Sequence, residues 1–242
     1  MFVLFTDFGL DGPYTGQMKA VLARKASQIP VIDLFADAPA WDIKASAYLL
    51  AAYAENFEEG DIFICVVVPG VGSDREWGVL KSDGRYFVGP DNGLFEIVMR
   101  RARMNEWRQG LWIPEQLSVS FHGRDIFAPV AAKIACEEDF PNKLRELEEI
   151  RRKNWTDDLG VIIYVDRYGN GITGIRASTL NKSSVLLVND TKINYGETFS
   201  SVPKDQTFWY ENSNGLVEIA ANMKRADEAL GLNVGVEVKI AD

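Results

Sequence analysis

Residues that can move protons or carry charge gather in one short stretch around the single histidine of the chain. His122 lies within Phe121–Asp125 (FHGRD), directly before a run with helical spacing. Its imidazole can accept or donate a proton near neutral pH. A lone histidine is more often structural, but its place between an aromatic residue and a glycine on a loop favours a ligand site. His122 is therefore a candidate for proton transfer.

Three further loops combine glycines with charged residues. Asp7 follows the apolar run 2–6, Arg75 ends the stretch 69–75 (PGVGSDR), and residues 89–93 read GPDNG. Glycine permits tight turns and close approach of the backbone to a ligand. Asp7 could instead simply form a turn, and Arg75 could form a surface ion pair. Each loop alone is therefore weak evidence of a ligand site.

Several classes of chemistry do not fit this sequence. It has no Walker P-loop and no nucleophile elbow, and the PGVG turn lacks the third glycine of the dinucleotide fingerprint. One histidine and two cysteines argue against a zinc site. Cys65 and Cys136 stand in apolar runs, so we expect both to be buried thiols in a reducing compartment.

Composition limits the partners. The 242 residues carry a net charge of −9, which argues against nucleic acid and against anionic membrane surfaces. We expect no signal peptide, because the first residues form a strand-like apolar run without a charged region before it, and no apolar run approaches the roughly 20 residues that a membrane helix needs. We therefore expect a cytoplasmic protein whose ligand is a small molecule.

The elements that must position these loops alternate in the first half of the chain. Apolar runs predict buried strands at 2–6, 31–35 and 62–68. We expect one helix to begin at Pro13 and another after Asp42. Two more are expected near 94–101 and at about 126–136, and a charged helix is expected at about 141–153. This alternation predicts an α/β domain over residues 1–153, with a doubly wound, mostly parallel sheet. Ligands of such sheets bind beyond the carboxyl ends of the strands, where the loops above lie.

The pattern changes after a linker at 154–158. Short strands punctuated by Asn, Gly and Asp follow one another, with one short helix at about 226–230. We predict a smaller β-rich domain over residues 159–242, similar to a barrel.

Taken together, the loops carry a family resemblance. The motifs TDFG (6–9), PYTGQMK (13–19), PGVG (69–72), GPDNGL (89–94), FHGRDIFAP (121–129), DRYGN (166–170) and NS (212–213) occur in one order over nearly the whole chain. This closely resembles the S-adenosylmethionine hydroxide adenosyltransferase family, which also contains fluorinating and chlorinating enzymes. The FHGRD and GPDNG motifs together make the resemblance specific.

The resemblance implies a reaction and an assembly. S-adenosylmethionine would be hydrolysed to adenosine and L-methionine by attack of water or hydroxide on the ribose C5′, with no metal and no organic cofactor. A homotrimer is implied, in which each site lies between the N-terminal domain of one subunit and the C-terminal domain of its neighbour.

The resemblance also assigns roles to residues. Arg75 and His122 match the residues that hold the attacking water. Asp7 would bind the ribose hydroxyls, Asp166 the methionine ammonium and Asn170 the adenine. The substrate-binding residues as a whole would be Asp7, Phe8, Trp41, Phe121, Asp166, Asn170, Ser213 and Asn214. For Trp41, core packing is the alternative.

Two positions line the expected pocket of the nucleophile and one of them departs from the family pattern. Val68 stands where the hydrolases have an aspartate, and a valine can neither accept a proton from water nor orient Arg75. Gly123 stands where the fluorinating relatives have a serine. At the methionine end, Gly12 and Asn214 replace an aspartate and an arginine of many relatives.

Three functions remain open: a working hydrolase, adenosyl transfer to another nucleophile such as halide, and a non-catalytic binder of S-adenosylmethionine or adenosine.

Overall fold

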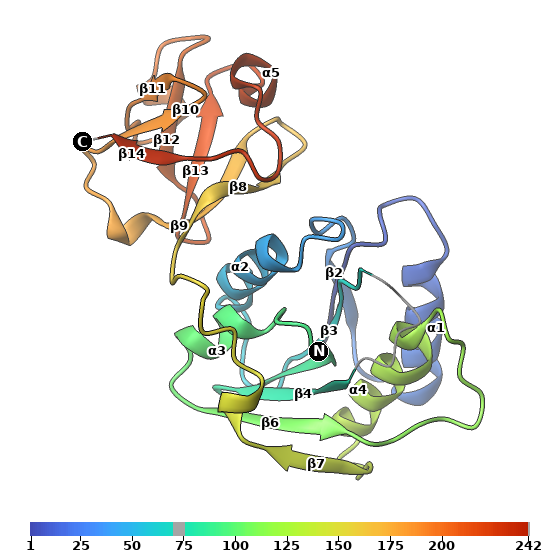
Figure 1. The fold of residues 1–242 in the computed structure, drawn as a ribbon. Coiled ribbons are helices and arrows are strands. Elements are labelled where there is room, and N and C mark those ends of the chain that lie inside the picture. Colours follow the sequence, from blue (N-terminus) through green and yellow to red (C-terminus); the bar gives the residue numbers. More distant parts are fainter. Residues whose placement is uncertain (70–75, 242) are drawn as a thin grey trace. The chain divides into compact units, whose positions relative to one another are not determined.

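A computed structural model describes residues 1–69 and 76–241 of the chain (Figure 1). These divide into two compact units, Met1–Asn154 and Trp155–Asp242. Among the described residues, no helix is long and apolar enough to cross a membrane.

The N-terminal unit is built on a seven-stranded mixed sheet with the order β2-β1-β3-β5-β4-β6-β7. The strands are β1 (Phe2–Thr6), β2 (Val31–Phe35), β3 (Ile62–Val66), β4 (Trp77–Ser82), β5 (Arg85–Pro90), β6 (Asn105–Gly110) and β7 (Asn142–Arg145). The four strands β2, β1, β3 and β5 are parallel, as the alternating first half of the sequence predicts. The other three pairs are antiparallel, which extends the parallel core into a mixed sheet.

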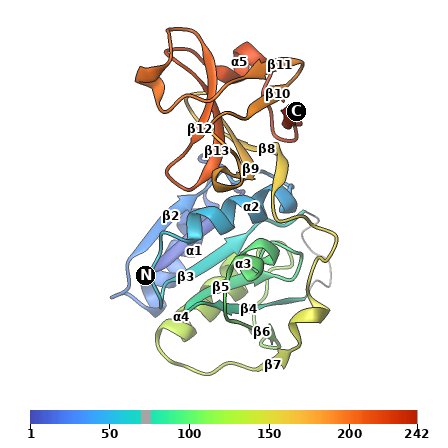
Figure 2. The ribbon, with the colours of Figure 1, turned by 90° about the vertical axis from the view of Figure 1, so that its left-hand side faces the viewer.

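Helices cover both faces of this sheet (Figure 2). They are α1 (Tyr14–Lys25), α2 (Ile43–Ala54), α3 (Glu96–Arg101), the π-helix Gly123–Phe127, α4 (Ala128–Ala135) and the 3₁₀ turn Leu147–Glu149. α1 packs with α4, and α2 packs with α3. The α2 start follows the sequence prediction, because the Asp42 side chain accepts the N–H of Ala45 at 2.9 Å and so caps the helix.

The central strands are buried on both faces, with side chains that alternate between the two layers. Phe2 and Leu4 of β1 join the core beneath α1 and α4, with Met18 and Leu22 of α1. On the opposite face of the sheet, Phe63 of β3 stacks on Phe87 of β5 with ring centroids 4.7 Å apart. This double burial explains the continuously apolar strand sequences.

Two sequence predictions for this unit are wrong. The stretch at 141–153 is not a charged helix: Asn142–Arg145 forms β7 and pairs with β6, since the edge of the sheet offers its backbone groups a partner. Cys136 is exposed because it caps the end of α4, whereas Cys65 in β3 is buried as expected.

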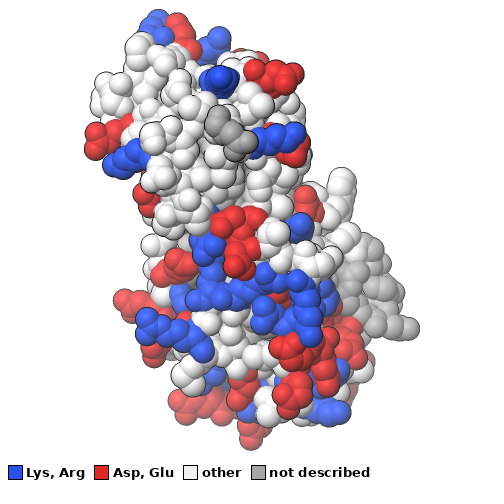
Figure 3. Space-filling view, turned by 60° about the vertical axis from the view of Figure 1, so that its left-hand side comes forward, with Lys and Arg blue, Asp and Glu red and all other residues white. Residues whose placement is uncertain are grey.

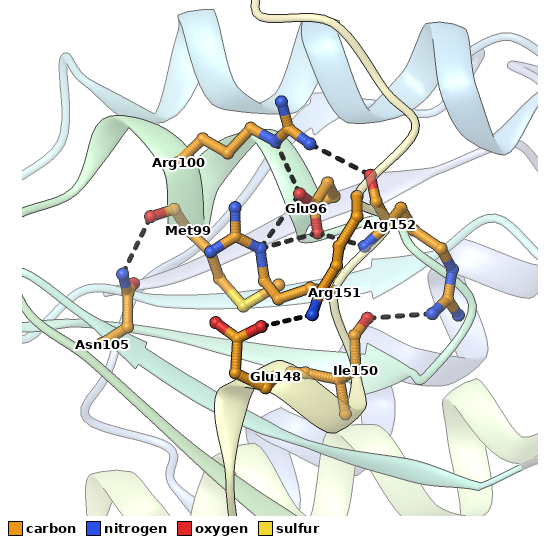
Figure 4. Close-up of polar contacts among 9 residues, drawn as sticks. Glu96, Met99, Arg100, Asn105, Glu148, Ile150, Arg151 and Arg152 are labelled. Carbon is orange, nitrogen blue, oxygen red and sulfur yellow. Dashed lines mark hydrogen bonds and ion pairs between the residues drawn. The ribbon is translucent and has the colours of Figure 1, made fainter.

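A buried carboxylate fastens the end of this unit to α3 (Figure 4). Glu96 has no exposed surface and accepts hydrogen bonds from the Arg100 Nε at 2.6 Å and the Arg151 Nε at 3.0 Å. The backbone N–H of Arg152 donates to its other oxygen at 2.8 Å. The guanidinium groups satisfy the buried charge, so residues 151–152 are fixed in place immediately before the unit ends.

Charges of both signs cover the surface despite the negative total. On the face seen in Figure 3, Lys and Arg side chains gather in one area of the N-terminal unit, beside groups of Asp and Glu. Pairs such as Arg108 with Glu106, joined at 2.6 Å, combine the two signs locally. The charge on this face is therefore mixed rather than uniformly acidic.

The C-terminal unit consists of two antiparallel sheets around one core, with orders β12-β13-β9-β8 and β11-β10-β14. Its strands are β8 (Leu159–Val165), β9 (Gly171–Arg176), β10 (Val185–Val188), β11 (Thr191–Ile193), β12 (Thr207–Glu211), β13 (Leu216–Ala221) and β14 (Lys239–Ala241). Its helical segments are α5 (Ala226–Leu230) and the 3₁₀ turns Ala177–Thr179 and Phe199–Ser201. Single bridges, Val161 with Glu237 and Tyr195 with Trp209, link the edges of the two sheets. They give the barrel-like closure that the sequence predicts.

Candidate active site

Asp7 lies at the carboxyl edge of the parallel strands. Its N–H donates to the Val66 carbonyl oxygen at 3.1 Å, which extends the pairing of β1 with β3 by one residue. The half-buried carboxylate accepts the backbone N–H of Trp41, while burial, the larger influence, raises the pKa of the Asp7 carboxyl. A carboxylate is thus held at the edge where open α/β sheets bind ligands.

The loop after β2 carries Trp41 to this edge. The Ala38 N–H donates to the Thr6 carbonyl oxygen at 3.0 Å and holds the loop against the end of β1. Trp41 has a φ of 62° and its side chain is 78% exposed. Trp41 is therefore not packed in the core of this unit, and its backbone N–H lies at the Asp7 carboxylate.

Three aromatic rings form a cluster next to Asp7. Phe8, Tyr14 at the start of α1, and Phe121 contact one another pairwise, with ring centroids 5.3–5.7 Å apart. Phe121 is 8% exposed and its ring also faces the guanidinium of Arg124 at 5.1 Å. The cluster gives this edge an apolar, flat-sided wall that suits a ribose or a purine ring.

Gly123 begins the π-helix that follows this wall. A Cβ at this position would lie 3.0 Å from the Val66 Cγ2 and 3.2 Å from the Met18 Sδ, which is tighter than ordinary contact. A side chain at this position would therefore require the Val66 and Met18 side chains to shift slightly. π-Helical turns often occur at functional sites, because they aim particular side chains.

The charged residues of the FHGRD motif hold the local structure. Arg124 donates to both oxygens of Asp125, at 2.6 and 2.9 Å, and to the Gln17 Oε1 at 3.0 Å. Asp125 also accepts the N–H of Ser118 at 2.8 Å. The hydrogen bond from Arg124 is the main reason why the pKa of Asp125 is lowered. The pair thus ties the π-helix to α1 and to the preceding loop.

His122 and Val68 complete the residues that the sequence assigns to the reacting centre of this unit. His122 is half-buried and directly precedes the π-helix; its positive form helps to lower the pKa of Asp125. Val68 follows β3 by two residues, is half-buried and packs against the core cluster that contains Phe121 and Val66. Arg75 lies outside the described residues.

The GPDNG motif supports the end of β3. The Asn92 side chain donates to the Val67 carbonyl oxygen at 2.9 Å and accepts the Leu94 N–H at 3.1 Å. Burial raises the pKa of Asp91, whose carboxylate lies 3.6 Å from a guanidinium nitrogen of Arg152. These contacts fix the backbone immediately before Val68.

The C-terminal unit brings its own set of predicted residues together. Asp166 and Asn170 enclose a turn after β8, in which the Asp166 Oδ1 accepts the Asn170 N–H at 2.8 Å and the Oδ2 accepts the Asn170 Nδ2 at 3.1 Å. Gly169 closes this turn with a φ of 84°, and a Cβ there would lie 2.3 Å from the Asp227 Oδ1. The DRYGN motif is therefore a rigid turn that presents an acid and an amide.

Ser213 and Asn214 occupy the turn between β12 and β13. The Asn212 Oδ1 accepts the Asn214 N–H and the Leu216 N–H, each at 3.0 Å, and thereby shapes the turn. Ser213 is exposed, and its hydroxyl accepts a hydrogen bond from the Asn214 Nδ2 at 3.2 Å.

The sequence interpretation missed Glu218 and its partner Tyr210 in the C-terminal unit. Glu218 in β13 is 5% exposed and binds both Asn212 and Tyr210, the latter at 2.6 Å. A charged residue inside the apolar run LVEIAA was the signal that pointed to a polar site. The fold thus assembles Asp7, Phe8, Trp41, Phe121 and Gly123 in one unit, and Asp166, Asn170, Ser213 and Asn214 in the other.

The two groups combine aromatic rings with a few carboxylate, amide and hydroxyl side chains. Among residues 1–69 and 76–241, no group of three or more His, Cys, Asp or Glu side chains is placed to hold a metal ion. The arrangement offers fixed hydrogen-bond acceptors and aromatic surface, which suit an organic ligand with hydroxyl and amino groups.

The chain is similar to known proteins over nearly its whole length. The chain is 34% identical to the (R)-S-adenosyl-L-methionine hydrolase of Thermus thermophilus, over 97% of both chains. It is 21% identical to the fluorinase of Nocardia brasiliensis, over 97% of this chain and 94% of that protein. An uncharacterised conserved protein from Thermotoga maritima has the same fold, with a TM-score of 0.84, 27% identity and full coverage of both chains.

The two halves of the chain also match the two domains of one family. Residues 2–143 match the SAM hydroxide adenosyltransferase N-terminal domain, and residues 160–239 match its C-terminal domain. The chain belongs to the SAM hydroxide adenosyltransferase family, with a distant relation to fluorinase.

Proposed function

We propose that this protein hydrolyses S-adenosylmethionine to adenosine and L-methionine. The observation that carries the proposal is the 34% identity, over 97% of both chains, to an (R)-S-adenosyl-L-methionine hydrolase. That name also supports the R configuration at the sulfonium as the preferred substrate. The fixed carboxylate of Asp7 beside an aromatic wall is consistent with a bound nucleoside.

The reaction is a substitution at the ribose C5′. The oxygen of water or hydroxide forms a bond to C5′ as the C5′–S bond breaks, and the bonding electron pair passes to sulfur. Methionine leaves as a neutral thioether, so the leaving group needs no general acid. The proton lost from water must go to a base or to solvent, which makes supply and alignment of the nucleophile the difficult part.

The chain's residues divide this work. Asp7 binds the ribose hydroxyls, Phe8, Trp41 and Phe121 enclose the nucleoside, and Asn170 binds the adenine. Asp166 pairs with the methionine ammonium, and the turn with Ser213 and Asn214 binds its carboxylate. His122 accepts the proton of the attacking water, and Arg75 attracts hydroxide by its charge.

We further propose that Val68 slows this hydrolysis. A valine at the position of the family aspartate leaves proton removal to His122 alone. The same substitution favours a second candidate function, a binder of S-adenosylmethionine or adenosine without turnover.

Chromatography of the substrate tests the proposal. Purified protein is incubated with each sulfonium epimer of S-adenosylmethionine, with and without halide, in water enriched in heavy oxygen. Hydrolysis predicts adenosine that carries the heavy isotope at its 5′-hydroxyl, with the R epimer consumed faster. Binding without product would support the non-catalytic binder, and a halogenated nucleoside would identify halide as the nucleophile.

We also propose a homotrimer with each site shared between neighbouring subunits. The ligand residues fall into two separate units, and the exposed side chain of Trp41 offers apolar surface at the edge of one of them. Sedimentation analysis tests this: a monomeric mass together with full ligand affinity would contradict it.

A further inference from the structure

The loop GPDNG, residues 89–93, has no part in the chemistry proposed above, but it lies against the end of β3. A Cβ at Gly89 would lie 2.8 Å from the Cys65 carbonyl oxygen, so glycine allows the end of β5 to come this near to β3. The Asp91 N–H donates to the Glu76 carbonyl oxygen at 2.9 Å and anchors the loop at the start of β4. The loop is thus fixed beside the residues that follow β3.

Two consecutive carbonyl groups lead from β3 to Val68, and they are held from opposite sides. In the sheet, β3 lies between β1 and β5. The Val66 carbonyl oxygen accepts the N–H of Asp7, which follows β1, at 3.1 Å. The Val67 carbonyl oxygen accepts the Nδ2 of Asn92, which follows β5, at 2.9 Å. The Asn92 side chain therefore satisfies a backbone group where the pairing of β3 with β5 has already ended.

Asn92 uses both functions of its amide in this contact. While the Nδ2 donates to Val67, the Oδ1 accepts the Leu94 N–H at 3.1 Å. A primary amide can donate and accept at once, whereas a carboxylate only accepts. A serine hydroxyl, which is one atom shorter, can accept the Leu94 N–H but cannot also reach Val67. Asparagine thus joins the turn to the strand end.

We propose that Asn92 is a positioning residue: it fixes the backbone that carries Val68, and with it one wall of the pocket for the attacking water. This inference rests on the proposed function, in which Val68 lines that pocket and Asp7 binds the ribose. Because Asp7 is anchored to Val66, the ribose and the pocket wall share one support. A displacement of about 1 Å between reacting groups can cost roughly 100-fold in rate. Asn92 acts through Val67, so its contribution belongs to alignment rather than to substrate affinity.

Two substitutions remove the bond to Val67 and keep the turn. In Asn92→Asp and Asn92→Ser the side chain can still accept the Leu94 N–H, but no donor reaches the Val67 carbonyl oxygen. The kcat for S-adenosylmethionine should fall about 10- to 100-fold, with KM within a few-fold of the parent. Asn92→Ser adds no charge, so it decides the question if Asn92→Asp does not fold.

Asn105 provides the matched control. Its Nδ2 donates to the Met99 carbonyl oxygen at 2.9 Å (Figure 4), and its Oδ1 accepts the Ser82 hydroxyl at 2.8 Å. It is half-buried like Asn92, but it lies at the opposite, amino edge of the parallel strands. Asn105→Asp and Asn105→Ser should lower the unfolding temperature as much as the Asn92 variants do, yet keep kcat near the parent value.

A carboxylate introduced at position 68 gives a second readout. If Asn92 aligns this position, the gain in turnover from Val68→Asp should fall to less than about a tenth when Asn92→Ser is also present. With Asn105→Ser in its place, the full gain should remain. Loss of stability alone would not separate the two backgrounds.

Each outcome bears on a distinct statement. If the parent protein releases no adenosine, the proposed function fails, and the positioning role fails with it. If the parent is active but folded Asn92→Ser keeps its kcat, or the Asn105 variants lose as much, Asn92 does not position the pocket although the proposed function stands. A loss of kcat confined to the Asn92 variants, with KM retained, supports the positioning role.

Discussion

Replacing Asp7 with asparagine should weaken ligand binding while leaving the empty protein at least as stable. The Asp7 carboxylate accepts the N–H of Trp41, and the larger influence on it is burial, which raises its pKa. Asparagine has nearly the same size and keeps one oxygen for that N–H. It loses the charge and the second acceptor.

The expected loss of affinity follows from the ribose contacts proposed for Asp7. Hydrogen bonds to a charged acceptor contribute about 1.5–3 kcal/mol each, and one such contact is lost outright. The dissociation constant for adenosine should therefore rise by about 10- to 150-fold. Both S-adenosylmethionine and adenosine carry the ribose diol, so both should be affected alike.

The effect on stability has the opposite sign. Because the folded-state pKa of Asp7 is raised, its contribution to stability is fully present below the ordinary pKa and is lost as pH rises through the raised value. At neutral pH the ionised side chain is thus a cost that a neutral asparagine removes. Asp7→Asn should unfold at an equal or higher temperature than the parent at neutral pH, and the difference should shrink in mild acid.

Calorimetry with adenosine and thermal unfolding at two pH values measure both effects. Asp139→Asn is the matched control, since Asp139 is an exposed acid of the same unit. Unchanged adenosine affinity in folded Asp7→Asn would refute the ribose role. A lower unfolding temperature at neutral pH would refute the argument from burial.

Three further predictions concern single substitutions. Glu96→Gln should lower the free energy of unfolding by about 3–5 kcal/mol in urea denaturation, because it removes the buried charge that pairs with the partly buried Arg100 and Arg151. Glu106→Gln, in an exposed pair, should change the free energy of unfolding by less than about 0.5 kcal/mol. Equal losses in the two variants would contradict this account. Val68→Asp should raise turnover by about 10²–10⁴-fold in the chromatographic assay, the range typical of a positioned base; an unchanged rate would show that this position supplies no base. His122→Ala should lower kcat by a similar factor with KM within a few-fold of the parent, and normal turnover would leave His122 a structural role.

The sequence predicted elements well where local signals were strong. The bounds of β1 and β2 match the apolar runs 2–6 and 31–35, and Asp42 caps α2 as expected. The short helix α5 also lies where it was predicted. In each case, residues close in sequence determine the structure.

Two of the missed strands, β6 and β7, depend on partners distant in sequence, whereas β4 and β5, which were also missed, pair with each other through a local turn. β6 reads NEWRQG and has no apolar alternation, yet it is held between β4 and β7 by backbone hydrogen bonds. β7 has the same origin: leucines at 144 and 147 suggest a helical face, but the free edge of β6 determines its conformation. Such pairing cannot be deduced from either segment alone.

The residues of the candidate site also fall into those that local sequence signals predicted and those that depend on distant segments. The motifs located Asp7, Phe121 and Asn170, because each stands beside glycines or at the end of an apolar run. Glu218 was missed because its hydrogen-bond partners Tyr210 and Asn212 come to it only when β12 pairs with β13. Its pairing partner in β9 is Ile172, so the antiparallel register brings β13 against the strand that follows the Asn170 turn.

The polarity of the candidate residues in each unit agrees with the way charge changes in the proposed reaction. The charges of hydroxide and the sulfonium neutralise each other in the transition state. Apolar surroundings favour this loss of charge once both reactants are bound. Val68 and the aromatic wall would supply such surroundings. An acid beside the sulfonium would instead stabilise the substrate more than the transition state. In our proposal, Asp166 is therefore directed to the methionine ammonium, whose contacts do not change during the reaction. The apolar wall that speeds the combination also makes hydroxide scarce, so the supply of nucleophile should limit this chain, and a carboxylate at position 68 should relieve that limit.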